Sequence, residues 1–225
     1  MKLQRIKTAD GSSTLLHESL GETYHSAKGA FSESMHVYIE AGLQFLQAQK
    51  PHTPLHILEV GYGTGMNALL SLTYARQPIY YTGLEPFPIQ EEELTTCREF
   101  FDASLAEAQE KMASLPWSHD TSYQQIHEHF YLRKLPCALI DYQADQQADL
   151  VYFDAFAPKY QPDLWQDEAW KHLMQQVKPG ALAVTYCAQG AFRRMLKQNQ
   201  LKVEILPGTP GQKKEMTRVI FSSGD

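Results

Sequence analysis

The sequence predicts an α/β fold in which a mostly parallel sheet carries helices on both faces and has an antiparallel edge near the C-terminus. From residue 55 onward, apolar strand-like runs alternate with segments of helical periodicity, which is the pattern of repeated strand–helix units. The last two strand-like runs, 201–206 and 216–221, have no helix between them, so we expect an antiparallel hairpin. A chain of 225 residues with 43% hydrophobic residues can build one such domain.

Apolar spacing and stop signals place the elements of the first half. A weak alternation before Gly21 predicts a short hairpin or arm. Ser32 is the expected N-cap of a helix over 31–49, which Pro51 and Pro54 follow. The remaining elements are strands at 55–60 and 79–84, a helix at 66–75 and one or two helices within 91–115. We expect residues 1–50 to form an N-terminal extension that packs over the site, and residues 51–225 to form the main domain.

The second half of the chain continues the alternation. Its expected strands are 127–132, 138–142, 149–154 and 181–187, followed by the closing pair. A helix over 168–177 is expected to stop at a turn formed by Pro179 and Gly180, and a short helix is expected over 191–198.

Composition limits the class of protein. The net charge of −6 argues against a protein that coats nucleic acid, because such binding rests on neutralising phosphates. Local basic patches remain, for which the candidates are Arg193, Arg194 and Lys197, and Lys213, Lys214 and Arg218. The apolar runs are too short to cross a bilayer and the N-terminus lacks an apolar signal region, so we expect a cytoplasmic protein. The widely spaced Cys97, Cys137 and Cys187 predict neither a disulfide framework nor a metal site.

The most informative motif is the glycine turn between the strand at 55–60 and the next helix. Gly61, Gly63 and Gly65 have Gly-x-Gly-x-Gly spacing, whereas a dinucleotide site needs Gly-x-Gly-x-x-Gly and receives a pyrophosphate at the helix N-terminus. Met66 stands where that third glycine belongs. The spacing favours S-adenosylmethionine, which carries no phosphate and lays its methionine part across the turn.

Two carboxylates stand where such a cofactor presents hydrogen-bond donors. Glu85 ends the second strand, 20 residues after Gly65, where an acid can accept both ribose hydroxyls. Glu59 precedes the turn, so it can steady the turn and face the ammonium group through a bonded neighbour or water. The turn and the two acids together predict a cofactor site.

A third acid, Asp154, ends the apolar run at 149–153. Ligands of open α/β sheets bind beyond the carboxyl ends of the strands, so this acid should lie beside the cofactor. The motif of an acid followed by an aromatic residue and proline, here Phe156 and Pro158, is similar to the signature of amino-group methyltransferases. A carboxylate there can align the lone pair of an amine and later accept its proton. The alternative is a strand-end Asp that only caps a turn.

Five blocks occur in order from Tyr24 onward: YHSAKGAFSESMHVYIEAGL, EVGYGTGMNAL, YFDAFAPKYQPDLW, VTYCAQGAFRRML and PGQKKEM. They resemble the methyltransferase domain of the bifunctional tRNA 5-methylaminomethyl-2-thiouridine biosynthesis protein MnmC and its stand-alone relatives. The resemblance implies a class I, Rossmann-like methyltransferase fold. It also implies methyl transfer from S-adenosylmethionine to the aminomethyl group of a wobble uridine in tRNA. The chain shows no second dinucleotide motif, so we expect the methyltransferase alone, without a flavin-dependent oxidase half.

The resemblance implies roles for individual residues. Its cofactor set is Glu59, Gly61, Tyr62, Gly63, Thr64, Gly65, Asn67, Glu85 and Pro86, and Asp154 is the essential acid. Its substrate set is Tyr24, Gly29, Glu33, Phe156, Pro158, Trp165, Arg193, Lys213 and Lys214. The first three of these should close over the methionine end or the target base, and the two lysines should hold tRNA phosphates. For Pro158 and Trp165, packing of the loop is an equal alternative.

The chain departs from the family pattern at one point. Relatives tend to carry Gly-Asp at the end of the third strand for the adenine amino group, but this chain has Cys137 and Ala138 there. Either Asp141, the nearest acid, takes that role after a change of register, or backbone groups alone hold the adenine.

Two other functions remain open from the sequence. A methyltransferase of the same fold could act on another amine or a small molecule, because the cofactor motifs do not identify the acceptor. A cofactor-binding protein could also retain the turn without turnover.

Overall fold

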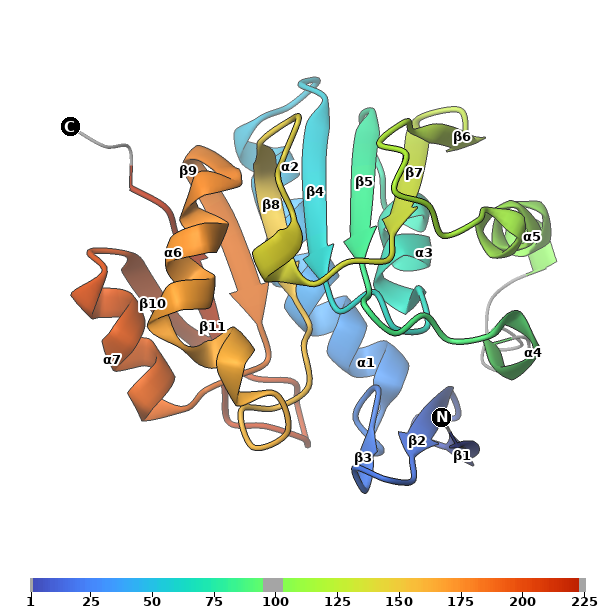
Figure 1. Ribbon diagram of the computed structural model, residues 1–225, viewed down its shortest axis with the longest axis horizontal. Coiled ribbons are helices and arrows are strands. Elements are labelled where there is room, and N and C mark those ends of the chain that lie inside the picture. Colours follow the sequence, from blue (N-terminus) through green and yellow to red (C-terminus); the bar gives the residue numbers. More distant parts are fainter. Residues whose placement is uncertain (1, 95–102, 223–225) are drawn as a thin grey trace.

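The computed structural model describes residues 2–94 and 103–222 and contains two sheets (Figure 1). The larger sheet has the strand order β10-β11-β9-β8-β4-β5-β7-β6. Its strands are β4 (Leu55–Val60), β5 (Ile79–Leu84), β6 (Gln124–His127), β7 (Phe130–Leu135), β8 (Ala148–Phe153), β9 (Val177–Thr185), β10 (Lys202–Pro207) and β11 (Glu215–Ile220). The pairs from β9 through β8, β4 and β5 to β7 are parallel, and β10 and β11 form the expected antiparallel edge. The predicted α/β class is confirmed.

Helices cover both faces of this sheet. The helical elements are α1 (Ala30–Ser34), η1 (Met35–Gln44), α2 (Phe45–Gln49), α3 (Met66–Thr73), α4 (Glu91–Leu94), η3 (Ala103–Leu105), α5 (Ala106–Ser114), η4 (Leu139–Asp141), η5 (Pro162–Trp165), α6 (Asp167–Gln175) and α7 (Gly190–Gln198). Side chains alternate along a strand, so Ile57 of β4 packs with η1 and α3 whereas Leu58 packs with α6 and α7. The sheet therefore has two separate hydrophobic cores.

The expected N-terminal hairpin is present as β1 (Leu3–Lys7) and β2 (Ser13–His17), which pair with β3 (Glu22–Thr23) in a three-stranded sheet. This small sheet lies at the end of the large sheet toward which β4 and β5 point (Figure 1). The helix from Ala30 to Gln49 packs into the same core as α3. The expected boundary between residues 1–50 and 51–225 stays a prediction.

The predicted N-cap at Ser32 is wrong. The helix begins at Ala30 after Gly29, and its first turn is capped from the hairpin by Asp10. Asp10 Oδ2 accepts the backbone N–H of Ser32 at 3.0 Å and its hydroxyl at 2.9 Å. A carboxylate at this position satisfies an otherwise unpaired N–H and favours the positive end of the helix. The cap is 22 residues distant in sequence, so local spacing could not reveal it.

The middle of this helix, Met35–Gln44, is a π-helix. Such segments are rare and occur frequently at functional sites. Tyr38 lies within it, is 1% exposed, and packs at 5.3 Å against the ring of Tyr152 in β8. The widened helix thus brings Tyr38 beside the last residues of β8.

Three local predictions differ from the structure. Residues 138–142 were expected to form a strand, but Pro136 follows β7 and Leu139–Asp141 form a single 3-10 turn that ends with Tyr142. The expected strand at 127–132 is two antiparallel strands, β6 and β7. Pro179 and Gly180 do not separate helix from strand, because β9 already begins at Val177 and accommodates them in a bulge.

Two predictions concern residues outside the described range: Cys97, and the part of the helical segment 91–115 that falls at 95–102. Among the helices of residues 2–94 and 103–222, none has both the length and the apolar character needed to cross a membrane.

Candidate active site

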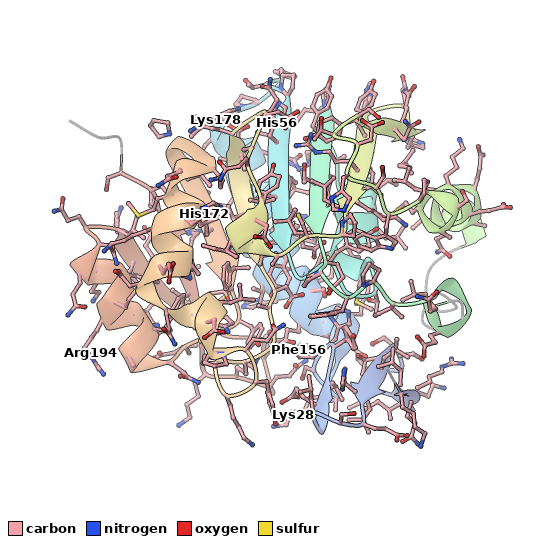
Figure 2. The ribbon with its side chains drawn as sticks, in the orientation of Figure 1. Lys28, His56, Phe156, His172, Lys178 and Arg194 are labelled. Carbon is pink, nitrogen blue, oxygen red and sulfur yellow. The ribbon has the colours of Figure 1, made fainter. Side chains whose placement is uncertain are left out.

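A cavity of about 1050 Å³ opens at the carboxyl ends of the parallel strands. Its walls come from the segment between β3 and α1, the glycine turn after β4, the ends of β5 and β7, the loop after β8 and the loop before β11. Phe156 and Lys28 mark this end of the sheet in Figure 2, whereas His56 and Lys178 lie at the opposite end. The cavity is thus where an open α/β sheet binds its ligand.

The glycine turn makes a close approach to the end of β8. Gly61 has φ +89°, and a Cβ there would lie 2.6 Å from the backbone oxygen of Asp154. Gly63 has φ +51°, and a Cβ there would meet the ring of Tyr24 at 3.2 Å. Both glycines line the cavity. Residues without a side chain therefore leave a concave surface where a ligand can lie against the backbone.

Glu85 lines the cavity beyond the end of β5, as predicted from its place in the sequence. Its Oε2 accepts the N–H of Gly63 at 3.2 Å and its Oε1 accepts the N–H of Phe87 at 3.1 Å. Burial raises the pKa of Glu85, and the two N–H donors oppose that rise. A carboxylate held in this way retains lone pairs that can accept hydroxyl groups of a ligand.

Glu59 does not line the cavity; it is fully buried behind the turn. Its Oε1 accepts a hydrogen bond from Asn67 at 2.8 Å, and its Oε2 accepts the hydroxyl of Tyr81 at 2.8 Å. Burial, together with the nearby charge of Asp154, raises the pKa of Glu59 well above its usual value. Asn67 therefore links Glu59 to Asp154, and the expected indirect contact of Glu59 with the cofactor stays a prediction.

Asp154 lies one residue beyond β8 and faces the cavity. Its Oδ1 accepts the hydroxyl of Tyr38 at 2.5 Å, and its Oδ2 accepts the amide of Asn67 at 2.8 Å. Burial raises the pKa of Asp154 to about 7, while the bonds from Tyr38 and Asn67 lower it. Two further lone pairs of the carboxylate remain for a ligand. An acid with a pKa near neutrality is suited to accept a proton at physiological pH.

The loop after β8 is held by its own side chains. The backbone N–H of Phe156 donates to Oε1 of Gln161 at 2.8 Å, and the indole N–H of Trp165 donates to the backbone oxygen of Phe156 at 2.8 Å. The ring of Phe156 packs edge-on against Tyr24 at 5.0 Å. Trp165 is 6% exposed, so it supports the cavity wall from behind while Phe156 forms part of it.

The N-terminal segment closes the cavity from the other side. His25 is buried, and its Nε2 lies 2.8 Å from the hydroxyl of Thr64 in the glycine turn. Burial lowers the pKa of His25 to about 4, so its ring is neutral at pH 7. Glu33 faces the cavity and forms an ion pair with Lys213 at 2.7 Å. Tyr186 lies under that lysine, with 3.8 Å from Nζ to the ring centroid.

The structure brings together about half of the residues expected in the site. The expected residues that line the cavity are Tyr24, Glu33, Gly61, Gly63, Glu85, Pro86, Ala138, Asp154, Phe156 and Lys213. The expected residues outside the lining are Gly29, Glu59, Tyr62, Thr64, Gly65, Asn67, Asp141, Pro158, Trp165, Arg193 and Lys214. Of these, Glu59, Thr64, Asn67 and Trp165 support lining residues or the glycine turn through the hydrogen bonds described above.

Three of the residues outside the lining have other structural surroundings. A Cβ at Gly29 would lie 2.8 Å from the carboxylate of Asp10, so this glycine makes room for the helix cap. Arg193 ties α7 to β11 through Glu215 Oε2 at 2.6 Å and Thr217 Oγ1 at 2.9 Å. Asp141 is exposed, whereas the preceding residues from Cys137 to Ile140 line the cavity.

Three contributors were not predicted from the sequence: Tyr38, His25 and Tyr186. Tyr186 directly follows β9, so the rule that selected Asp154 would also have selected it. His25 adjoins Tyr24 in a block that was already of interest. Tyr38 had no local signal, because its contact with Asp154 spans 116 residues.

Known proteins are similar to this chain in sequence and in fold. Residues 118–221 match the model of a family described as S-adenosyl-L-methionine-dependent methyltransferase. The tRNA 5-methylaminomethyl-2-thiouridine biosynthesis bifunctional protein MnmC of Ralstonia nicotianae is 29% identical over 210 residues, which cover 89% of this chain but only 32% of that protein.

Two solved structures support the same fold. The crystal structure of MNMC2 from Aquifex aeolicus has a TM-score of 0.78 at 23% identity, covering 100% of this chain and 73% of that one. Spermidine synthase from Thermotoga maritima has a TM-score of 0.58 at 13% identity, covering 99% of this chain and 69% of that one. The fold and the match over residues 118–221 agree: the chain has the class I, Rossmann-like fold of S-adenosyl-L-methionine-dependent methyltransferases.

Proposed function

We propose that this protein transfers the methyl group of S-adenosylmethionine to the primary amine of 5-aminomethyluridine or its 2-thio form at the wobble position of tRNA, giving the methylaminomethyl form. The observation that carries the proposal is Asp154, a carboxylate at the end of β8 that faces the cavity beside the glycine turn. The likeness to MnmC, whose name refers to tRNA 5-methylaminomethyl-2-thiouridine, supports this acceptor.

The residues present fit the cofactor. The glycine surface at Gly61 and Gly63 leaves room that a Cβ would fill, and Glu85 offers lone pairs to ribose hydroxyls. The cavity is lined by carboxylates, among them Glu33 and Asp154, which favour a cationic ligand. We propose that backbone groups between Cys137 and Ile140 hold the adenine, because Asp141 is exposed and outside the lining.

S-adenosylmethionine, when bound, supplies an electrophilic methyl carbon attached to a positively charged sulfur. Held against Gly61, Gly63 and Glu85, it would give up its methyl group to a neutral amine, and the electron pair of the S–C bond would stay on sulfur. Asp154 accepts a hydrogen bond from the amine and so aligns its lone pair, and it then takes the proton that the methylated nitrogen releases. Phe156 and Tyr24 form an aromatic wall suited to a flat pyrimidine ring. Lys28, at the cavity, and Lys214 are exposed and are candidates for contact with RNA phosphates.

The test is methylation in vitro with labelled S-adenosylmethionine. Purified protein should label tRNA that carries the aminomethyl group and leave tRNA without it unlabelled. Asp154→Ala should lose at least roughly 100-fold in kcat and bind S-adenosylhomocysteine almost as the unchanged protein does. In cells that lack the protein, mass analysis of wobble nucleosides should show accumulated aminomethyluridine.

The alternatives predict different results. Labelling of a small amine but of no tRNA would assign a different acceptor to the same chemistry. Cofactor binding with no labelled product in either case would indicate a binding protein without turnover.

A further inference from the structure

Lys213 lines the cavity, although 37% of its side chain is exposed to solvent. Its ammonium group is 2.7 Å from Oε1 of Glu33 and 3.8 Å from the ring centroid of Tyr186. The hydroxyl of Tyr186 donates to the backbone oxygen of Ala155 at 2.8 Å, one residue after Asp154. The other oxygen of Glu33 accepts the N–H of Ser26 at 3.3 Å. The lysine is therefore held by a carboxylate and an aromatic face, both of which line the same cavity as the catalytic acid.

We propose that Lys213 is a positioning residue of the methyl-transfer site: its ammonium group, held by Glu33, stabilises the ionised form of Asp154 and disfavours a second positive charge on the incoming amine. This inference rests on the proposed function for the identity of the amine. It differs from the expectation that Lys213 holds tRNA phosphates, because the ion pair with Glu33 occupies the lysine at the cavity wall.

The charge of Lys213 bears on the protonation state of the amine and of Asp154. A primary alkyl amine is protonated in water near neutral pH, and its lone pair is then unavailable for attack. Inside a cavity of low dielectric, a fixed cation nearby destabilises the ammonium form and stabilises the carboxylate. The amine must lose its ammonium proton to water before attack, so that Asp154 is still ionised when the methylated nitrogen releases its proton. The charge of Lys213 therefore acts through Asp154.

Asp154 is surrounded by several groups that affect its charge. Tyr38 of the π-helix and Asn67 of α3 donate hydrogen bonds to it, and Glu59 of β4 lies behind Asn67. Glu33 raises the pKa of Asp154, whereas Lys213 lowers it. The two members of the ion pair therefore act on Asp154 in opposite directions.

This opposition allows a double-mutant test. Lys213→Met should move the titration of the Asp154 carboxyl upward from about 7, and Glu33→Gln should move it downward. The double variant should titrate between the two single variants. Lys213→Arg keeps the charge and should also stay close. The measurement is ¹³C NMR of aspartate carboxyls, with the Asp154 resonance assigned from Asp154→Asn.

The kinetic arm uses the proposed reaction. Lys213→Met should reduce kcat/KM on tRNA roughly two- to threefold at pH 7 and less at pH 9. The reason is that the acid limb of the profile of kcat/KM against pH moves to higher pH. Lys111→Met is the matched control, since Lys111 pairs with Glu107 at 2.8 Å on exposed α5; its acid limb should not move.

The outcomes separate the inference from the function on which it rests. An Asp154 titration unmoved by Lys213→Met overturns the inference, whether or not tRNA is methylated. A weaker tRNA affinity with a shallower salt dependence and an unmoved acid limb also overturns it, in favour of a phosphate contact. If the unchanged protein methylates no tRNA, the proposed function fails while the NMR titration still decides the role of Lys213.

Discussion

The hydroxyl of Tyr38 lies 2.5 Å from Oδ1 of Asp154 and joins a π-helix to the end of a strand 116 residues later. Burial raises the pKa of this tyrosine well above its usual value, so it remains a hydrogen-bond donor across the physiological range. The fixed donor orients the carboxylate and favours its ionised form.

Tyr38→Phe should move the acid limb of kcat/KM upward. Loss of a hydrogen bond to a charged group is worth about 1.5 kcal/mol, which corresponds to about one pKa unit. Activity at pH 7 should fall severalfold and recover in part above pH 8, measured as initial rates of tRNA methylation against pH.

The matched control for this variant is Tyr152→Phe. Tyr152 packs against Tyr38, but its hydroxyl lies 3.0 Å from that of Ser71 and not at Asp154. Its acid limb should stay in place. A similar shift in both variants would show that the effect comes from repacking of the aromatic core.

Asp154→Asn should stabilise the protein at alkaline pH while abolishing methyl transfer. Burial raises the folded-state pKa of Asp154 from 3.8 to about 7. A carboxyl whose pKa is higher in the folded state disfavours folding once it ionises, so its cost grows from about pH 4 to pH 7 and is constant above. We expect a gain of about 1–3 kcal/mol in the free energy of unfolding at pH 8 and none at pH 4, measured by urea denaturation. Equal gains at both pH values would contradict this account.

Gly61→Ala should remove cofactor binding and lower stability by more than its backbone conformation alone explains. A Cβ at Gly61 would lie 2.6 Å from the backbone oxygen of Asp154, and its φ is +89°. Gly11 has a similar φ of +86° with no atom within 4 Å of its Cβ position. Gly11→Ala therefore measures the backbone cost, about 1 kcal/mol, and should leave S-adenosylhomocysteine binding unchanged by calorimetry.

Asp10→Ala should weaken the helix that carries Glu33 and Tyr38. Asp10 accepts hydrogen bonds from Thr8, Ser12 and Ser32, which hold its pKa well below the usual range. A depressed folded-state pKa gives stability that is present above pH 4 and is lost as the pH falls below it. The variant should lose about 1–2 kcal/mol at pH 7 and less at pH 2.5, by chemical denaturation. Ser32→Ala keeps the backbone N–H and should lose less.

The features that were predicted correctly depend on residues that are close together in the sequence. The glycine turn, Glu85 and Asp154 each follow a strand, and the geometry of a parallel sheet brings strand ends to one edge. A local pattern therefore predicted both the fold and the centre of the cavity.

Long-range contacts explain what was missed. Asp10 caps a helix from another element, and Lys213 pairs with a residue 180 positions earlier. An exposed lysine in a turn-rich loop also looks like a phosphate contact until the position of Glu33 is known. Leu139 suggested a strand through its apolar neighbours, but it is buried in a turn that lines the cavity.

The ion pair of Lys213 and Glu33 also bears on how the site assembles. It joins the helix that follows the N-terminal sheet to the loop between β10 and β11, so its ends, 180 positions apart, meet only after the segment between them has been synthesised. Contacts of such high sequence separation form slowly, because the entropy of closing a long loop must be overcome first. We expect the glycine turn that binds the cofactor to form before the ion pair of Lys213 and Glu33. During refolding, cofactor binding should therefore recover earlier than methyl transfer.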